Sequence, residues 1–120
     1  MTTAYATSAD GVAWDWHGTV LAPRPGTWDQ RGARLTVVLP DGRAAYDGRA
    51  SKEENWFERT GLARLTRERP GALEQVGDDA VRDVRYLDVL PLPEGGYRIW
   101  YEARLPDESH ELRTELIPPR

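Results

Sequence analysis

Short stretches of hydrophobic and β-branched residues, each ending at a turn signal, follow one another along the whole chain. The clearest are Arg34 to Leu39 and Val84 to Leu90, each of which leads through a proline to an acidic residue and a glycine. A second such stretch follows each turn, which is the pattern of a β-hairpin. The same pattern predicts strands near residue 44 and at Tyr5 to Ser8, Gly18 to Ala22, Thr60 to Thr66, Leu73 to Val76, Tyr97 to Arg104 and His110 to Ile117. A short helix over Gly61 to Arg67 is the alternative there, but the flanking turns favour a strand.

Two of these segments repeat each other. Residues 34–49 and 85–104 share an arginine, a hydrophobic strand, a proline with an acidic-glycine turn, and a Tyr-Asp/Glu-x-Arg sequence. Three pairs of residues keep one spacing of 55 residues: Tyr46 with Tyr101, Asp47 with Glu102, and Arg49 with Arg104. Repeated short strands with a period of about 50 residues are typical of propeller blades.

The predicted strands fall into groups of two, four and three. Residues 33–77 hold four strands and predict one complete blade, whereas residues 84–117 hold three and residues 1–22 hold the outer half of another. We therefore expect a single all-β domain of about nine antiparallel strands over residues 1–120, arranged as two or so four-stranded blades of a partial propeller. If the first two strands fold back onto the last three, the same strands form a small β-sandwich instead.

Several motifs resemble those of one family. The run Tyr5 to Trp14, followed by Gly18 to Leu21, resembles the S-x-D-G-x-x-W…G-x-V-L motif of five-bladed β-propeller glycoside hydrolases of the arabinanase, xylosidase and levanase type (relatives of families 43 and 32). The two Tyr-Asp/Glu-x-Arg sequences also resemble segments of these proteins. The resemblance implies the C-terminal part of a five-bladed propeller, and a site built from three carboxylates that act as base, pKa modulator and acid.

In a propeller, alternate loops lie on opposite faces. The longer loops all fall on one of these faces, and they are rich in carboxylates and tryptophan: Pro23 to Ala33, Gly48 to Glu58, Gly77 to Asp83 and Pro106 to Ser109. The turns on the other face are short. Binding sites are usually carried by such loops over a rigid scaffold, so we expect the site on this rim.

Sugars suit these side chains, because tryptophan stacks on the apolar faces of sugars while carboxylates and guanidinium groups bind hydroxyls. Glycoside hydrolysis needs two carboxyl groups, so the candidate catalytic residues are Asp29, Asp47 and Glu102. The candidate substrate-binding residues are Trp28, Arg34, Arg49, Asn55, Trp56, Arg85, Arg104 and His110.

A structural interpretation of the same residues stays open. Asp47 with Arg49, and Glu102 with Arg104, stand two residues apart on one side of a strand and could form ion pairs that lock blades together. Arg34 and Arg85 could pair with these carboxylates for the same purpose. Three tryptophans are expected to pack between blades: Trp14, Trp16 and Trp100.

Composition excludes several classes of function. The 120 residues contain no cysteine, which excludes a disulfide scaffold, a thiol nucleophile and a zinc–thiolate site, and two histidines cannot form a His-rich metal site. We expect neither a metal nor a cofactor. The net charge is −4 with both signs interleaved, so no basic stripe for nucleic acid exists. No apolar run is long enough to span a membrane and no secretory segment follows Met1, so we expect a cytoplasmic location.

The expected function is that of a glycoside hydrolase-like propeller fragment that binds carbohydrate or is a degenerate glycosidase. Two alternatives remain open. One is a complete glycosidase of the arabinanase, xylosidase or fructosidase type, whose site forms by oligomerisation, and the other is a non-catalytic structural or interaction module. Because open sheet edges and blade faces associate readily, we expect a homo-oligomer or a partner chain that completes the propeller.

Overall fold

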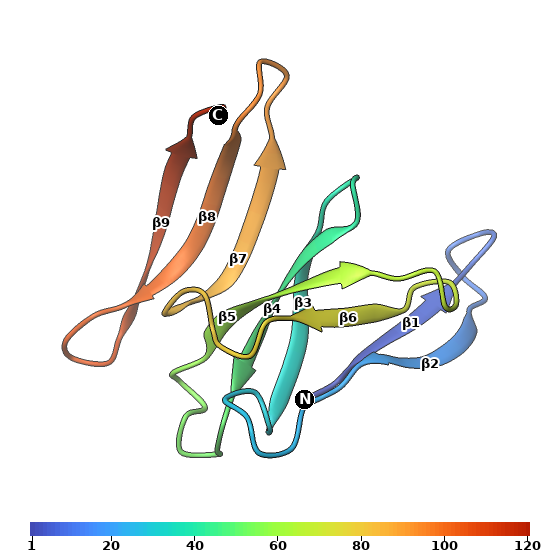
Figure 1. The fold of residues 1–120 in the computed structure, drawn as a ribbon, viewed down its shortest axis with the longest axis horizontal. Helices are drawn as coiled ribbons and strands as arrows, with labels where there is room; N and C mark the ends of the chain where they lie inside the picture. Colours follow the sequence, from blue (N-terminus) through green and yellow to red (C-terminus); the bar gives the residue numbers. More distant parts are fainter.

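The computed structural model describes residues 1–120 and consists of nine antiparallel strands in three sheets (Figure 1). The first sheet contains β1 (Thr3–Thr7) and β2 (Asp15–Leu21). The central sheet has the order β3 (Gly32–Val38), β4 (Arg43–Arg49), β5 (Arg59–Leu65) and β6 (Leu73–Val76). The last sheet has the order β7 (Val84–Pro91), β8 (Tyr97–Arg104) and β9 (His110–Ile117). These groups of two, four and three strands confirm the predicted all-β class, and no helix is long and apolar enough to cross a membrane.

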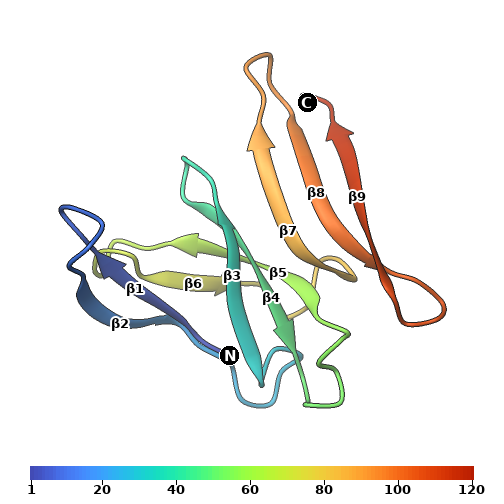
Figure 2. The ribbon, with the colours of Figure 1, turned by 180° about the vertical axis from the view of Figure 1, so that it is seen from behind.

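The first and last sheets lie on opposite sides of the central sheet (Figures 1 and 2). Leu21 of β2 packs with Tyr46 of β4, whereas the next residue of β4, Asp47, accepts a hydrogen bond from the last sheet. Neighbouring residues of a strand point to opposite faces, so the two contacts lie on the two faces of the central sheet. Strand β2 pairs only with β1, and the fold-back onto the last sheet is therefore not the arrangement that the chain adopts.

The repeat seen in the sequence is present in the hydrogen-bond register. Arg34 lies opposite Asp47 in the β3–β4 pair, and Arg85 lies opposite Glu102 in the β7–β8 pair. Each pair is followed by a bulge on the first strand, and each hairpin turns at a glycine in the left-handed region, where a side chain would be strained. Asp47 and Glu102 therefore occupy equivalent positions in two copies of one structural unit.

The apolar core is small and divided in two. One cluster joins Leu21 to the face of the central sheet that carries Tyr46, and the other lies within the last sheet. Trp28 closes the first cluster by lying against Gly48 and Gly61, at positions where a side chain would collide with its ring. Only 20 of the 120 residues are buried, so polar contacts contribute much to the orientation of the sheets relative to one another.

The exposed tryptophans of the first sheet correct one expectation. Trp16 is 73% exposed and Trp14 is 62% exposed, so neither packs between sheets within the chain, and only Trp100 is half-buried. The reason is that the first sheet has two strands and its far side is covered by no other element.

The equivalent tyrosines of the two units make the same polar contacts. Tyr46 Oη donates to Asp29 Oδ2 at 2.7 Å, and Tyr101 Oη donates to Glu115 Oε1 at 2.7 Å. In each case an arginine completes the group by pairing with the carboxylate: Arg24 with Asp29, and Arg82 with Glu115. The two groups differ in burial, because the side chain of Asp29 is fully covered whereas that of Glu115 is 40% exposed.

This difference predicts unequal effects of removing the two hydroxyls. Tyr46→Phe deprives a fully buried carboxylate of a donor and should lower the free energy of unfolding by about 1–2 kcal/mol. Tyr101→Phe should cost clearly less, because water can replace the donor at Glu115. Urea unfolding of both variants beside the natural chain measures the two losses, and an equal or larger loss in Tyr101→Phe would show that burial does not decide the effect.

Candidate functional site

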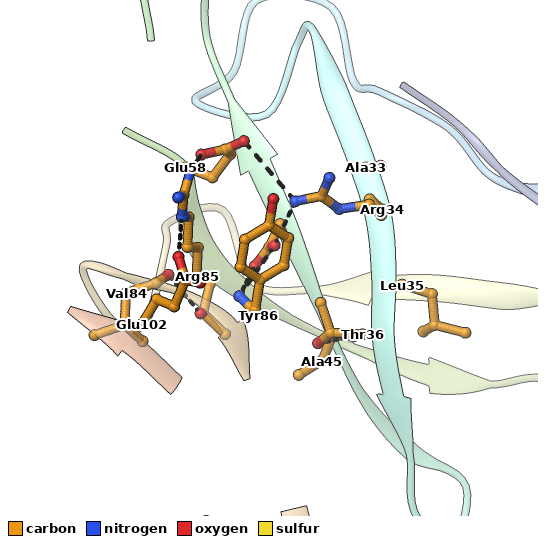
Figure 3. A network of polar contacts seen from close by, with 12 residues as sticks. Ala33, Arg34, Leu35, Thr36, Ala45, Glu58, Val84, Arg85, Tyr86 and Glu102 are labelled. Atoms are coloured by element: carbon orange, nitrogen blue, oxygen red, sulfur yellow. Dashed lines mark hydrogen bonds and ion pairs between the residues drawn. The ribbon is translucent and has the colours of Figure 1, made fainter. Parts of the chain in front are cut away.

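Five charged side chains form a network that links the central and last sheets (Figure 3). Arg34 Nη2 lies 2.9 Å from Asp47 Oδ2, and Arg85 Nε lies 2.8 Å from Glu102 Oε2. These are the two cross-strand pairs that the repeat places at equivalent positions. We call these four residues, together with Glu58, the inter-sheet network.

Glu58 connects the two pairs. It immediately precedes β5, is buried, and accepts a hydrogen bond from Arg85 Nη1 at 3.3 Å. Its other oxygen lies 3.8 Å from Arg34 Nη2, so one carboxylate faces an arginine from each sheet. Arginine suits this role because its planar guanidinium can donate to two carboxylates at once.

Tyr86 fills the space between the two arginines. Its ring lies between the guanidinium groups of Arg34 and Arg85, whose Cζ atoms are 4.5 Å and 4.9 Å from the ring centroid (Figure 3). Its backbone is in the left-handed region, with a φ of 55°, which costs a residue with a Cβ about 1–2 kcal/mol. This conformation aims the Tyr86 N–H at both oxygens of Asp47, at 3.2 Å each. The bulge in β7 thus supplies a donor that a regular strand would have used within its own sheet.

Burial sets the protonation behaviour of Asp47. The side chain is fully covered, and the loss of solvent raises its pKa above the ordinary value of 3.8. The hydrogen bonds from Arg34 and Tyr86 act in the opposite direction, while the nearby charge of Glu58 adds to the rise in pKa.

Asp29 lies on the other face of the central sheet. It is also fully covered, but it accepts hydrogen bonds from Thr27, Tyr46 and Arg24. Burial opposes its ionisation, yet these donors together outweigh burial and lower the pKa of Asp29 below 3.8. Of the three candidate catalytic carboxylates, the structure thus brings Asp47 and Glu102 into one network and leaves Asp29 on the opposite side of the sheet.

The ion pairs considered within single strands do not form. Asp47 pairs with Arg34 rather than Arg49, and Glu102 pairs with Arg85 rather than Arg104. Directly opposite positions on paired strands bring long side chains closer than positions two residues apart along one strand. Arg104 instead pairs with Asp83 at 2.9 Å, and the Nε of Arg49 is buried without a hydrogen-bond partner.

Three of the four loops that were expected on one rim meet there, and Pro23 to Ala33 is the exception. Residues from the loops before β5, before β7 and between β8 and β9 line an open cleft of about 650 Å³, which we call the rim cleft. Its walls carry charges of both signs, and Phe57 supplies an apolar surface under the guanidinium of Arg104, which lies 4.7 Å from the ring centroid. The polar side chains of the walls are Glu54, Arg59, Asp83, Arg104 and Glu108.

The remaining candidate binding residues lie at different distances from this cleft. Asn55 and Trp56 are exposed in the loop that also supplies Glu54 and Phe57, and His110 lies opposite Arg104 at the start of β9. Trp28 is half-buried and stacks on Tyr46, with the guanidinium of Arg59 5.5 Å from its ring centroid. Trp28 therefore packs beneath Arg59, which lines the cleft.

Arg104 of the cleft was a candidate from the sequence, but reasoning from the sequence missed Glu58, Arg59, Asp83 and Glu108. Glu58 and Asp83 stand at the last positions of two predicted loops, where the sequence does not tell a solvated residue from one that turns inward. Glu108 is, with Tyr86, one of only two residues other than glycine that have positive φ. Strained backbone of this kind gathers at functional sites, and here one example lies on the cleft wall and the other in the network beside it.

Comparisons of the chain with protein-family models, with curated protein sequences and with solved structures find no match. The resemblance to five-bladed glycoside hydrolases therefore stays a prediction, as do the catalytic and substrate-binding roles. No group of three or more histidine, aspartate or glutamate side chains gathers in a way that could hold a metal ion.

The opposite pKa shifts of the two buried aspartates predict opposite trends with pH. The folded chain holds the Asp47 proton more tightly than the unfolded chain, so the stability that the natural chain shows relative to Asp47→Asn should fall as pH rises above 3.8. The folded chain releases the Asp29 proton more readily, so stability relative to Asp29→Asn should fall as pH drops below 3.8. Denaturant unfolding of all three proteins across acidic pH measures both trends, and two trends of the same sign would contradict the assignment.

Proposed function

We propose that the rim cleft binds a carbohydrate chain and that the protein holds this chain without hydrolysing it. The observation that supports binding is the composition of the cleft, whose lining combines three carboxylates and two guanidinium groups with the ring of Phe57. Planar charged groups of both signs donate and accept hydrogen bonds and so match the hydroxyls of a neutral sugar, while an aromatic ring packs against its apolar face.

The state of the candidate catalytic carboxylates supports binding without hydrolysis. A general acid must reach the glycosidic oxygen, and a nucleophile or base must reach the anomeric carbon or its water. Asp29 and Asp47 are fully covered, and Glu102 is held by Arg85. Each carboxylate already has an arginine partner, and none of the three lines the cleft.

The inter-sheet network explains how the cleft keeps its shape. Phe57 and Arg59 flank Glu58 in sequence, Asp83 stands two residues before Arg85, and Arg104 stands two residues after Glu102. Each wall of the cleft thus contains a residue that lies only one or two positions in sequence from a member of the inter-sheet network. Side chains that are positioned before the ligand arrives lose less entropy on binding, so the network favours recognition by the loops above it.

Binding can be tested with arabino-, xylo- and fructo-oligosaccharides, which the resemblance to glycoside hydrolases suggests as first probes. The fluorescence of Trp56, exposed beside the cleft, should change on titration, and calorimetry should give the affinity. We expect Arg104→Gln and Arg59→Gln to weaken binding about tenfold or more, because each removes charged hydrogen bonds of about 1.5–3 kcal/mol. Arg64→Gln is the matched control, since Arg64 is an exposed, ion-paired arginine of β5 outside the cleft.

Two results would overturn this proposal. Absence of heat and of fluorescence change with all three probes would remove carbohydrate as the ligand. Release of reducing sugar that disappears in Asp47→Asn or Glu102→Gln would establish hydrolysis and the catalytic roles that the sequence suggested.

A further inference from the structure

The face of the last sheet that points away from the central sheet is covered by nothing in the chain. Arg43 of β4 donates a hydrogen bond to Tyr97 of β8, but Tyr97 lies on the opposite face, because it precedes Arg98 by one residue. Cross-strand pairing places Leu90 beside Arg98 and Leu116, and Glu102 beside Leu112, on this face. We call it the outer face; its three leucines are 51%, 73% and 62% exposed at Leu90, Leu112 and Leu116.

The internal repeat allows the outer face to be compared with the equivalent face of the central sheet. Glu102 on the outer face is the equivalent of Asp47, and the face of the central sheet that carries Asp47 is covered by the last sheet. In that covered copy the carboxylate is fully buried and accepts a hydrogen bond from the sheet packed on it, whereas the side chain of Glu102 is 33% exposed. The outer face is therefore equivalent to the face of the central sheet on which the last sheet packs, but no element covers it.

The exposed area of the chain is too large for a compact protein of its mass. The chain exposes 7774 Å², whereas a compact folded chain of 13.6 kDa exposes about 6,600 Å². The radius of gyration, 15.3 Å, also exceeds the value of about 13.6 Å for 120 residues in a compact domain. The excess area, about 1,200 Å², is of the size that each partner buries in a stable interface, about 800 Å² or more.

We propose that a second copy of this chain packs its own outer face on this one around a two-fold axis. Arg98 and Glu102 of this face complement each other across such an axis, whereas Asp88 lies opposite Trp100 and meets its own copy. Arg98 and Glu102 stand two residues before and after Trp100 on β8, and Arg98 has no ion-pair partner within the chain. An axis that crosses the strands over Trp100 sets Arg98 of each copy against Glu102 of the other, and Leu116 of each against Leu112 of the other. Such an interface is isologous, the commonest kind in soluble oligomers.

Sedimentation or light scattering over a range of concentrations tests the proposal. The natural chain should have twice the mass of 13.6 kDa, and the double variant Leu112→Glu and Leu116→Glu should be a monomer at the same concentrations. Both leucines are exposed in the single chain, so the far-ultraviolet circular dichroism of the variant should be unchanged. Val12→Glu is the control, because Val12 is an 84% exposed apolar residue in the turn between β1 and β2, away from this face. Arg98→Glu should raise the dissociation constant of the dimer at least tenfold, since it opposes like charges.

Cross-linking tests the position of the axis. The chain contains no cysteine, and Asp88 lies opposite Trp100, so an Asp88→Cys variant places two thiols across the axis. A short bis-maleimide should join this variant into a covalent dimer, while Lys52→Cys in the exposed loop before β5 should give little product. Three results would overturn the proposal: a monomeric natural chain at the highest soluble concentration, a dimer that persists in the double leucine variant, or equal cross-linking of the two cysteine variants.

Discussion

The arrangement of this protein depends on charged side chains that join two sheets whose buried apolar clusters remain separate. Asp47 accepts from Arg34 of its own sheet and from the Tyr86 N–H of the next, and Glu58 lies between the arginines of both. Removing such carboxylates from water carries a free-energy cost that only complete pairing offsets. The pairing is close to complete here, because each carboxylate meets a guanidinium and Asp47 meets a backbone donor as well. The specificity of these contacts fixes the angle between sheets whose apolar clusters do not extend from one to the other.

The strain at Tyr86 is a consequence of this network. A residue with a side chain adopts a φ of 55° only where its contacts offset the strain. Two contacts stabilise this conformation of Tyr86: the hydrogen bond from its N–H to the buried Asp47 carboxylate, and the position of its ring between two guanidinium groups. The bulge in β7 has a counterpart in β3, between Leu35 and Val37, but no residue of β3 has a positive φ. In the central sheet the unit is covered and completed, and in the last sheet it faces outward, which links the internal repeat to the proposed association of two copies.

The sequence predicted the part of this structure that is local or repeated. Strand positions followed from turn chemistry, and three predicted strands, β6, β8 and β9, match the structure at both ends. The equivalence of Asp47 and Glu102 followed from the spacing that they share with the neighbouring tyrosine and arginine pairs. Residues at the same position of two similar hairpins pair with the same position of the partner strand. The convergence of three of the four long loops on one rim followed from the alternation of loops in an up-and-down sheet.

What could not be predicted depends on contacts between segments distant in sequence. Nothing local to Glu58 shows that it turns inward to meet two arginines, and nothing local to Asp29 shows that it lies on the opposite face from Asp47. Trp16 looked like packing because of its residue type, yet no sheet covers it. The hydrogen exchange of the Tyr86 amide tests the central claim most directly, because this N–H of the last sheet bonds to Asp47 of the central sheet. If the network holds the two sheets as one unit, this amide should exchange as slowly as the strand amides of β4 and β8; exchange at the rate of the exposed loops would contradict the account.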